Sequence, residues 1–440
     1  MESPAFGHKD FGRRDFGRRD FGRLAALGVG GPALLAACGE GGGAHDASSV
    51  AANGAAAAAR SWKVTGRSLS GLGGFDATVK GFMQARNIPC GQLAVARKGK
   101  LLLARGYTWS ASTSLKTSPT SLFRIASLSK PITATAVLRL IQEGRLKPTD
   151  RVATLLKLPA HADPRLADVT VLRLLQHLGG WDRDTSPDPM FQDAAIAKAL
   201  KKGLPVSRAD IMRWESGRRL DHKPGTAYAY SNYGYMLLGR IIEKVSGQSY
   251  GAYVQAKVLG PRGIKRMKLA HGLTKAAGEV PYYSSAKGAT VYDNSGKQVA
   301  YPYGGFNIEN MDAHGGWLGT AVDLTRFARI YDGGTPVLNA ASISRAFAKP
   351  ETGIDPGGWY YGTGWMVRPV TGGRNTWHDG SLPGTSTLLV RRFDGLTWAV
   401  LFDQRQEGSQ PSYGDIDGAL HQAANAVRTW PTGDLYGSYF

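Results

Sequence analysis

Apolar runs separated by turn residues predict strands near both ends of the folded part of the chain. Two such runs flank a Lys-Gly-Lys turn at 98–100 and predict a β-hairpin over 92–107. Two more flank Asp394-Gly395 and predict a second hairpin over 387–402. We therefore expect an antiparallel sheet that both ends of the chain complete.

Between the hairpins, apolar positions repeat with the spacing of an α-helix. One stripe runs over 132–141 before Gly144, and a second runs over 237–245 before Gly247. The stretch 415–430 is predicted to be a terminal helix. Strands near the ends and helices in the middle predict a helical insertion that packs against the sheet.

The composition allows a large core and excludes several classes of protein. Apolar residues make up 42% of the 440-residue chain and charged residues 20%, which excludes a wholly disordered or fibrous protein. Two cysteines are too few for a disulfide framework or a Cys-based zinc site. The 9 histidines are scattered without an H-E-x-x-H pattern. We expect neither a metal nor another cofactor.

The formal net charge of +20 favours anionic surroundings, such as acidic lipid or cell-wall polymer. A solvated basic surface explains the same charge without a specific partner. Because the sequence contains no RNA-binding signature and no basic run with interleaved aromatic residues, nucleic acid is not an expected partner.

The first residues resemble a bacterial export signal of the twin-arginine type. Arginine pairs at 13–14 and 18–19, each followed by Asp-Phe, precede small and apolar residues over 24–37. The sequence Leu-Ala-Ala-Cys that ends at Cys38 resembles a lipobox, in which the cysteine thiol accepts the lipid. The alternative is an alanine-rich tail with an incidental cysteine.

This signal predicts a division of the chain into three parts. Residues 1–37 would be the signal peptide, 38–62 the lipidated cysteine and a flexible tether, and 63–440 the folded domain. The mature protein would be an exported lipoprotein of the cell envelope, periplasmic or on the outer face, and anchored to a membrane. Cys90 is predicted to be a small buried residue.

Ser127 and Lys130 form an S-x-x-K motif at the start of the first predicted helix. Residues three apart lie on one face of a helix, and an amine kept neutral by burial can accept the serine proton. The alternative is an N-cap serine with a surface lysine. The stretch 284–287 also matches S-x-x-K, but it lies in a loop-like region.

Tyr230 and Asn232 form a Y-x-N motif next to the helix predicted over 233–246. A phenol near ammonium groups can have its pKa lowered and can shuttle protons, while an amide can position an acyl group. The alternative is a core tyrosine followed by a helix-capping Asn232. The sequence Tyr-Asp-Asn at 292–294 matches too, but no predicted helix follows it.

His378, Gly380 and Ser381 belong to an H-D-G-S sequence shortly before an apolar strand run. The glycine allows a substrate to approach a strand edge, whose amides can donate to an oxyanion. The alternatives are a structural histidine at 378 and the competing sequence His-Gly-Gly, which begins at His314.

These three motifs, in this order, resemble those of the serine β-lactamase and penicillin-binding protein family, in its class C β-lactamase, DD-carboxypeptidase and esterase branch. The similarity covers roughly 75–405, and the matching stretches are 123–150, 224–247, 315–328 and 378–386. The resemblance implies an α/β fold, with an antiparallel sheet flanked by helices and an all-helical subdomain over roughly 150–330.

The resemblance also implies roles for the motif residues. Ser127 would be the acylated nucleophile, and Lys130 and Tyr230 would transfer protons. Backbone amides of Ser127 and Ser381 would form the oxyanion hole. The residues that would position, face or closely approach the substrate are Asn232, His378 and Gly380.

Asp379 departs from the family's third motif, which often has threonine at the middle position. A carboxylate in the cleft would repel an anionic substrate by about 4 kcal/mol at about 4 Å and an effective dielectric near 20. This argument favours neutral or cationic substrates, unless strand alternation points Asp379 away from the cleft.

We therefore expect an exported serine hydrolase that forms a covalent acyl-enzyme on Ser127 and acts as an esterase or amidase. One alternative is a DD-carboxypeptidase or β-lactamase acting on peptidoglycan-like or β-lactam substrates. Another is a noncatalytic binding lipoprotein of the cell envelope. The expected partners are a small ester, amide or cell-wall-like substrate, and a membrane through the lipid anchor.

Overall fold

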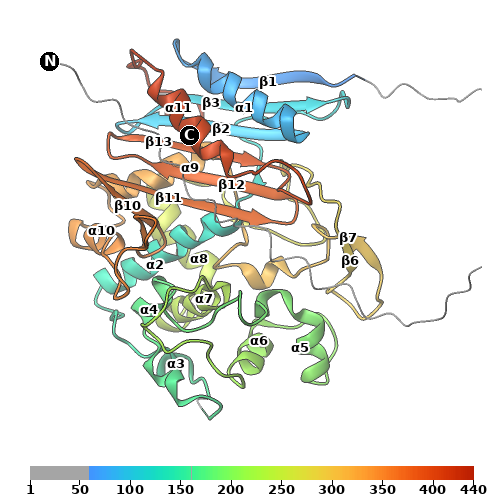
Figure 1. Ribbon diagram of the computed structural model, residues 1–440, viewed down its shortest axis with the longest axis vertical. Helices are drawn as coiled ribbons and strands as arrows, with labels where there is room; N and C mark the ends of the chain where they lie inside the picture. The colour runs from blue at the N-terminus through green and yellow to red at the C-terminus, as the bar shows by residue number, and fades with distance from the viewer. Residues whose placement is uncertain (1–58, 160) are drawn as a thin grey trace, which may run out of the picture. The chain divides into compact units, whose positions relative to one another are not determined.

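The computed structural model describes residues 59–159 and 161–440 (Figure 1). The predicted signal peptide and Cys38 lie outside these residues. At the centre is an eight-stranded antiparallel sheet with the order β1-β3-β2-β13-β12-β11-β10-β9. Its strands are β1 Ser61–Ser68, β2 Cys90–Arg97, β3 Lys100–Ser110, β9 Tyr360–Tyr361, β10 Met366–Val370, β11 Gly373–Leu382, β12 Thr385–Arg391 and β13 Leu396–Phe402.

Both predicted hairpins are confirmed, as β2–β3 and β12–β13. Strand β2 pairs with β13, so the two hairpins lie side by side in the middle of the sheet. Both strands are buried on both faces, which explains their nearly continuous apolar sequences. The expected antiparallel sheet, completed from both ends of the chain, is therefore present.

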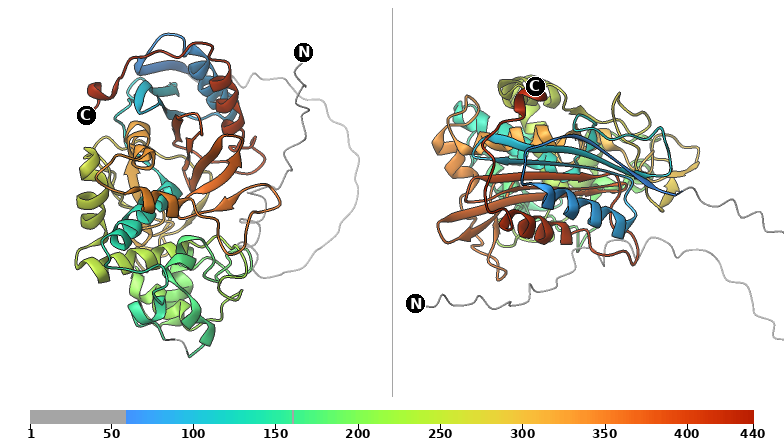
Figure 2. Two further views of the ribbon diagram at one scale, coloured as in Figure 1. Left: turned by 90° about the vertical axis from the view of Figure 1, so that its left-hand side faces the viewer. Right: turned by 90° about the horizontal axis from the view of Figure 1, so that it is seen from above.

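Two helical layers cover the sheet. Helices α1 (Gly73–Arg86) and α11 (Asp415–Asn425) lie together on one face, as the right-hand view of Figure 2 shows. Side chains such as Trp398 and Val400 of β13 fill the core under these helices. Their neighbours in β13 point the other way, into a larger core shared with α9 (Ala321–Ala328) and the remaining helices.

The remaining helices all lie between the two hairpins along the chain. The two long ones, α2 (Ser129–Gln142) and α7 (Asn232–Ser246), pack against each other and match the predicted apolar stripes. The shorter helices are α3 Val152–Leu156, α4 Val171–Leu175, α5 Asp193–Ala199, α6 Arg208–Glu215, α8 Tyr250–Val254 and α10 Ala340–Ala346. In the described part of the chain, no helix is both long and apolar enough to cross a membrane.

Short strands also occur between the hairpins. Strand β8 (Trp317–Gly319) pairs with β4 (Phe123–Arg124) and with β5 (Lys268–Leu269). A separate hairpin consists of β6 (Lys287–Ala289) and β7 (Gln298–Ala300). Runs of two or three residues are too short to show alternation in the sequence.

The terminal helix ends earlier than its apolar pattern predicts. Helix α11 stops at Asn425, whereas the prediction extended to Trp430. Pro431 disfavours the helical conformation at the residue before it. The Trp430 ring instead packs against Phe75 of α1, with 6.3 Å between the ring centres.

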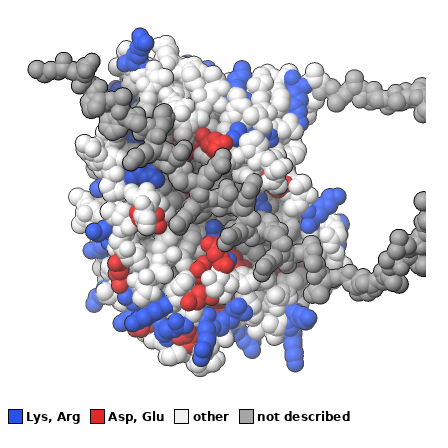
Figure 3. All heavy atoms as spheres, viewed as in Figure 1, with Lys and Arg blue, Asp and Glu red and all other residues white. Residues whose placement is uncertain are grey.

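Lysine and arginine side chains are spread over the face shown in Figure 3, and many line its lower edge, where the helical region lies. Exposed Lys201, Lys202, Arg213 and Arg219 belong to this region. Acidic side chains lie among the basic ones on the same face. This distribution is typical of a mixed, solvated surface.

Candidate active site

Ser127 lies in a 3-10 turn, η1 (Ala126–Leu128), immediately before α2 rather than on the helix itself. Its neighbour Ala126 has a φ of 48°, in the left-handed region that costs a non-glycine residue about 1–2 kcal/mol. The turn packs against β11, where a Cβ on Gly380 would lie 3.0 Å from the Ser127 amide nitrogen. The site therefore requires glycine at position 380.

Lys130 connects the serine to the rest of the site. Its Nζ lies 3.1 Å from Ser127 Oγ, 2.7 Å from Asn232 Oδ1 and 3.1 Å from the His314 carbonyl oxygen. The side chain is completely buried, so it is not the surface lysine of the alternative interpretation.

The surroundings of Lys130 favour its neutral form. Burial lowers the pKa of Lys130 well below its usual value, the Arg183 charge lowers it further, and Asp188 and Asp379 oppose the shift. A neutral amine has two N–H groups and one lone pair. The carbonyl oxygens of Asn232 and His314 can accept the two N–H groups, which leaves the lone pair for the Ser127 hydroxyl.

Asn232 is the first residue of α7, and its side-chain amide joins Lys130 to Asp188. Its Nδ2 donates to Asp188 Oδ2 at 2.6 Å, which fixes Oδ1 toward Lys130. Asn232 does not cap the helix, because the Ser231 hydroxyl accepts the hydrogen bond from the Gly234 amide. The capping role considered for Asn232 is therefore wrong, and its side chain is available to the site.

Tyr230 lies between the side chains of Lys130 and Arg183. Lys130 Nζ is 4.6 Å and Arg183 Cζ is 4.7 Å from the centre of its ring, and its hydroxyl hydrogen-bonds with Ser127. Burial nevertheless raises the pKa of the Tyr230 phenol above its usual value, and the Arg183 charge and the Ser127 hydrogen bond offset this only in part. The expected lowering of the Tyr230 pKa is therefore wrong, because desolvation outweighs the Arg183 charge and the Ser127 hydrogen bond.

Strand β11 forms the other wall of the site. Its pairing with β10 ends at Trp377, so the edge of residues 378–382 on that side is unpaired within the described part. Positions 378 and 380 face the Ser127 side of the sheet. The cross-strand partner of His378, Leu389, belongs to the larger core, and the partner of Gly380, Thr387, donates to the Ile125 carbonyl just before Ser127. Ser381 follows on the same edge.

His378 is held by protein atoms at both ring nitrogens. Its Nδ1 donates to the Asp379 carbonyl at 2.6 Å, so Nε2 accepts from the Tyr361 hydroxyl at 2.9 Å. Burial lowers the pKa of His378 to about 4, and the imidazole is neutral at pH 7. His378 therefore forms part of the wall, and both of its ring nitrogens are occupied by protein atoms.

Asp379 is exposed, and its side chain lies on the opposite face of the sheet from His378. Its cross-strand partner Leu388 belongs to the core under α1 and α11. The Asp379 charge acts on Lys130 only as the smallest of the influences on the pKa of that amine. The Asp379 side chain therefore points away from the site, and the argument that it repels anionic substrates does not hold for this geometry.

Comparison with known proteins identifies the family. Residues 75–422 match the model of the family described as Beta-lactamase. The chain belongs to the beta-lactamase family. It is a serine hydrolase of this family, which confirms the resemblance at the level of the family and the expected α/β fold.

Two curated relatives illustrate the similarity of this beta-lactamase-family hydrolase. The protein named "Probable fimbrial assembly protein FimD, serogroup H1" of Dichelobacter nodosus is 38% identical over 144 residues, which cover 32% of this chain and 34% of that protein. Protein flp of Staphylococcus aureus (strain MW2) is 32% identical over 192 residues, which cover 43% of this chain and 36% of that protein. The chain thus spans about a third of the length of these relatives.

Solved structures show the same fold. The octameric penicillin-binding protein homologue from Pyrococcus abyssi has a TM-score of 0.61 and 24% identity, and covers 80% of this chain and 77% of its own. The D-amino acid amidase from Ochrobactrum anthropi SV3 has a TM-score of 0.63 and 21% identity, and the match covers 80% of this chain and 99% of the amidase chain. At these identities the likeness shows the fold alone.

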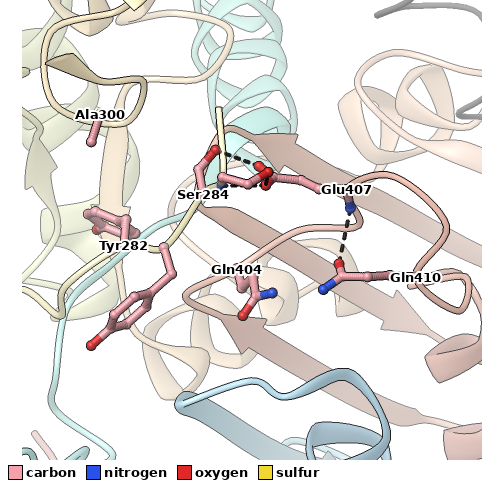
Figure 4. Close-up of a pocket in the computed structure, with 8 residues that line it drawn as sticks. Tyr282, Ser284, Ala300, Gln404, Glu407 and Gln410 are labelled. Carbon is pink, nitrogen blue, oxygen red and sulfur yellow. Dashed lines mark hydrogen bonds between the residues drawn. The ribbon is translucent and has the colours of Figure 1, made fainter. Parts of the chain in front are cut away.

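The competing sequence motifs in the beta-lactamase-family hydrolase have other roles. Ser284 Oγ and Ser285 Oγ both donate to Glu407, at 2.5 and 2.6 Å, in a pocket of about 420 Å³ that Figure 4 shows. The Tyr292 hydroxyl bonds Glu309 instead of a serine or lysine. His314 does reach the site, but through its carbonyl group.

Three residues of the site were not predicted from the sequence: His177, Arg183 and Asp188. The His177 ring is buried 4.3 Å from that of Tyr230, and its Nδ1 accepts from the Ser231 amide. Asp188 and Arg183 come from the loop before η3 (Pro189–Phe191). No spacing rule links a loop residue to a motif on another element, so only the fold reveals them.

Proposed function

We propose that this protein is an esterase or amidase that forms an acyl-enzyme on Ser127. The observation that carries the proposal is the buried Lys130 amine, 3.1 Å from Ser127 Oγ and held by two carbonyl oxygens. A serine hydroxyl is a weak nucleophile at neutral pH and needs an adjacent base. Lys130 is placed and tuned to be that base.

In the proposed acylation, Lys130 takes the Ser127 proton while Ser127 Oγ attacks the carbonyl carbon of the substrate. The carbonyl oxygen becomes an oxyanion, which accepts from the backbone amides of Ser127 and Ser381. The close contact of Gly380 with the Ser127 amide supports this placement. An oxyanion-hole donor typically contributes about 3–4 kcal/mol to the transition state.

Collapse of the tetrahedral intermediate requires a proton for the leaving group. Tyr230 is suited to donate it, because its raised pKa keeps the phenol protonated beside Ser127. The phenolate that remains would lie between the charges of Lys130 and Arg183, and would recover a proton from the Lys130 ammonium. Water then hydrolyses the ester on Ser127 through the same groups in reverse.

The substrate class is proposed from the walls of the site. Tyr228 and Trp359 meet edge to face at 5.6 Å beside Tyr361, and Tyr228 is partly exposed. An aromatic surface next to Tyr230 suits an apolar acyl or side-chain group. The fold shared with a D-amino acid amidase adds amino-acid amides to the esters as substrates to test.

The test is a hydrolysis screen with p-nitrophenyl esters, amino-acid amides, a chromogenic cephalosporin and D-alanyl-D-alanine peptides. Ser127→Ala should lose activity by several orders of magnitude, because no other group forms the covalent intermediate. Ser284→Ala is the matched control, since it removes the serine of the second S-x-x-K sequence. A fluorophosphonate adduct on Ser127, seen by intact mass, completes the assignment. Equal activity of Ser127→Ala and the native protein would refute the proposal.

A second candidate is a DD-carboxypeptidase or β-lactamase, whose substrates carry a carboxylate. The outward-facing Asp379 and the cationic Arg183 beside Tyr230 favour it. Faster turnover of the cephalosporin or of the D-alanyl peptide than of neutral esters would select this candidate.

We also propose export and lipid anchoring at Cys38. Support comes from the order of arginine pairs, apolar stretch, small residues and cysteine over 13–38. Metabolic labelling with a fatty acid should label the native protein and not Cys38→Ala. Labelling that persists in Cys38→Ala would contradict lipidation at this residue.

A further inference from the structure

The pocket in Figure 4 lies on segments that the catalytic proposal does not use. Three segments form it: residues 282–285, Ala300 at the end of β7, and the loop 404–410 that follows β13. Its volume of about 420 Å³ is within the range of small-molecule sites. None of the lining residues belongs to the candidate active site, so a ligand in this pocket would not be the group that reacts with Ser127.

Glu407 holds two of these segments together. Its carboxylate accepts from the Ser284 hydroxyl at 2.5 Å, and from both the amide and the hydroxyl of Ser285 at 2.6 Å. The Tyr283 amide donates to the Asp403 carbonyl at 3.0 Å, which fixes the same segment to the end of β13. The walls are thus joined before any ligand binds, and binding would cost little conformational entropy.

The charge of Glu407 is compensated within the protein. Burial opposes its ionisation, but the hydrogen bonds from Ser284 and Ser285 and the charge of Arg405 hold the pKa of Glu407 below its usual value. An ionised carboxylate in the wall repels a second anion, which disfavours phosphate or carboxylate ligands. A cation gains little either, because Arg405 already offsets the negative charge. The electrostatics therefore favour an uncharged polar ligand.

Two glutamine side chains bring further hydrogen-bonding groups to the pocket. Gln410 Oε1 accepts from the Glu407 amide at 3.1 Å, while its Nε2 has no hydrogen-bond partner among the described residues. The Gln404 side chain forms no hydrogen bond within residues 59–159 and 161–440. Figure 4 shows the two amide groups turned toward each other beside Glu407. An amide offers both donors and an acceptor, so the pocket suits ligand groups that do the same.

Tyr283 adds an aromatic surface to this polar wall. It lines the pocket, and 41% of the residue is exposed. A flat aromatic ring packs well against the C–H face of a saturated ring, and hydroxyl groups at the edge of that ring then reach the polar groups beside it. Hydroxyl groups both donate and accept, which matches the amides and the carboxylate.

We propose that this pocket binds a sugar ring. The C–H face of the sugar would pack on Tyr283, and its hydroxyls would bond Gln404, Gln410 and Glu407. A sugar is uncharged, carries several hydroxyls and has an apolar face, so it meets each condition that the pocket sets. The site is additional to the proposed hydrolysis at Ser127 and does not depend on it.

The test uses the full folded chain with glucose, galactose and N-acetylglucosamine as probes. At least one should bind in titration calorimetry, and saturation-transfer NMR should show the strongest saturation on the C–H protons of one sugar face. Tyr283→Ala and Gln404→Ala should each weaken binding at least tenfold. Gln406→Ala, which removes an exposed glutamine of the same loop outside the pocket lining, is the matched control and should bind as the native protein does. Failure of all three sugars to bind, or equal binding by the two variants and the native protein, would overturn the proposal.

Further variants separate binding from a structural role. In the absence of sugar, Gln404→Ala should keep the native thermal midpoint, because the side chain it removes forms no hydrogen bond in the described part of the chain. A lower midpoint would assign Gln404 to packing and overturn its place in the site. Tyr283→Phe keeps the ring and should retain sugar binding, whereas a loss equal to that of Tyr283→Ala would contradict the stacking.

Two controls test the class of ligand and the independence of the site. Methylammonium is the cationic probe, and its binding in place of the sugars would overturn the assignment to an uncharged ligand. Ser127→Ala should bind the sugar as the native protein does, so that failure of the hydrolase proposal and failure of the sugar site can be told apart. Loss of sugar binding in Ser127→Ala would contradict a separate site.

Discussion

Replacing Arg183 with glutamine tests the electrostatic basis of the proposed mechanism. Arg183 and Lys130 lie 4.7 and 4.6 Å from the centre of the Tyr230 ring, so their charges are at most about 9 Å apart. At that separation and an effective dielectric near 20, their repulsion is about 2 kcal/mol, slightly more than one pKa unit. Removing Arg183 should therefore raise the pKa of Lys130 by about one unit.

The sign of the effect on activity follows from the role of Lys130. The amine must be neutral to accept the Ser127 proton, so kcat/KM rises with pH through the pKa of Lys130. In Arg183→Gln the acid limb of the pH profile should move up by about one unit, and activity below that limb should fall about tenfold. At alkaline pH, activity should approach that of the native enzyme.

The assay is the pH dependence of kcat/KM for a neutral p-nitrophenyl ester, which carries no charge that Arg183 could bind. Arg183→Lys keeps the positive charge and should retain most of the native profile, while Arg213→Gln controls for loss of a surface arginine from the same region. A uniform fall in kcat/KM at every pH, with no movement of the acid limb, would refute the reasoning. That result would assign Arg183 to substrate contact or to packing.

Three further predictions concern single side chains. Asn232→Asp should abolish activity at neutral pH, because a carboxylate 2.7 Å from Lys130 would hold the amine protonated; a pH–rate profile checks this, and an unchanged acid limb would contradict it. Gly380→Ala should lower stability by about 1–3 kcal/mol in urea unfolding, because its Cβ would lie 2.4 Å from Thr387 Oγ1; a native midpoint would contradict the contact. Burial raises the pKa of Asp403 to about 8, so the folded state binds a proton that the unfolded state has lost between about pH 4 and 8, and stability falls as pH rises through that window. Asp403→Asn should flatten this decline in urea unfolding followed against pH, and an equally steep decline in the variant would contradict the assignment.

The sequence predicted the scaffold well, because the scaffold depends on local patterns. The two hairpins and the helices α2 and α7 follow from apolar spacing and turn residues, and the structure confirms them. The motif residues Ser127 and Lys130 were found because three positions along one turn of chain bring two side chains together. The pairing of β2 with β13 was visible only as an expectation that the two ends share a sheet.

The electrostatic character of the site was not predictable in this way. The pKa of Tyr230 depends on a balance between burial and the Arg183 charge, and Arg183 comes from a loop with no pattern. The direction of Asp379 depended on the register of β11 with β12. Register and burial arise from the whole fold, so they could be read only once the fold was known.

The adjacency of β2 and β13 has a consequence for how the polypeptide reaches its native state. Cys90 and Asp403, which bond across this junction, are 313 positions apart in the chain. Such distant pairing makes folding slow, because most of the polypeptide must be synthesised before the middle of the sheet can close. Until then the β2–β3 hairpin presents an unpaired apolar edge that can join a like edge of another nascent molecule. A chain truncated before residue 385 should therefore aggregate rather than persist as a soluble fragment.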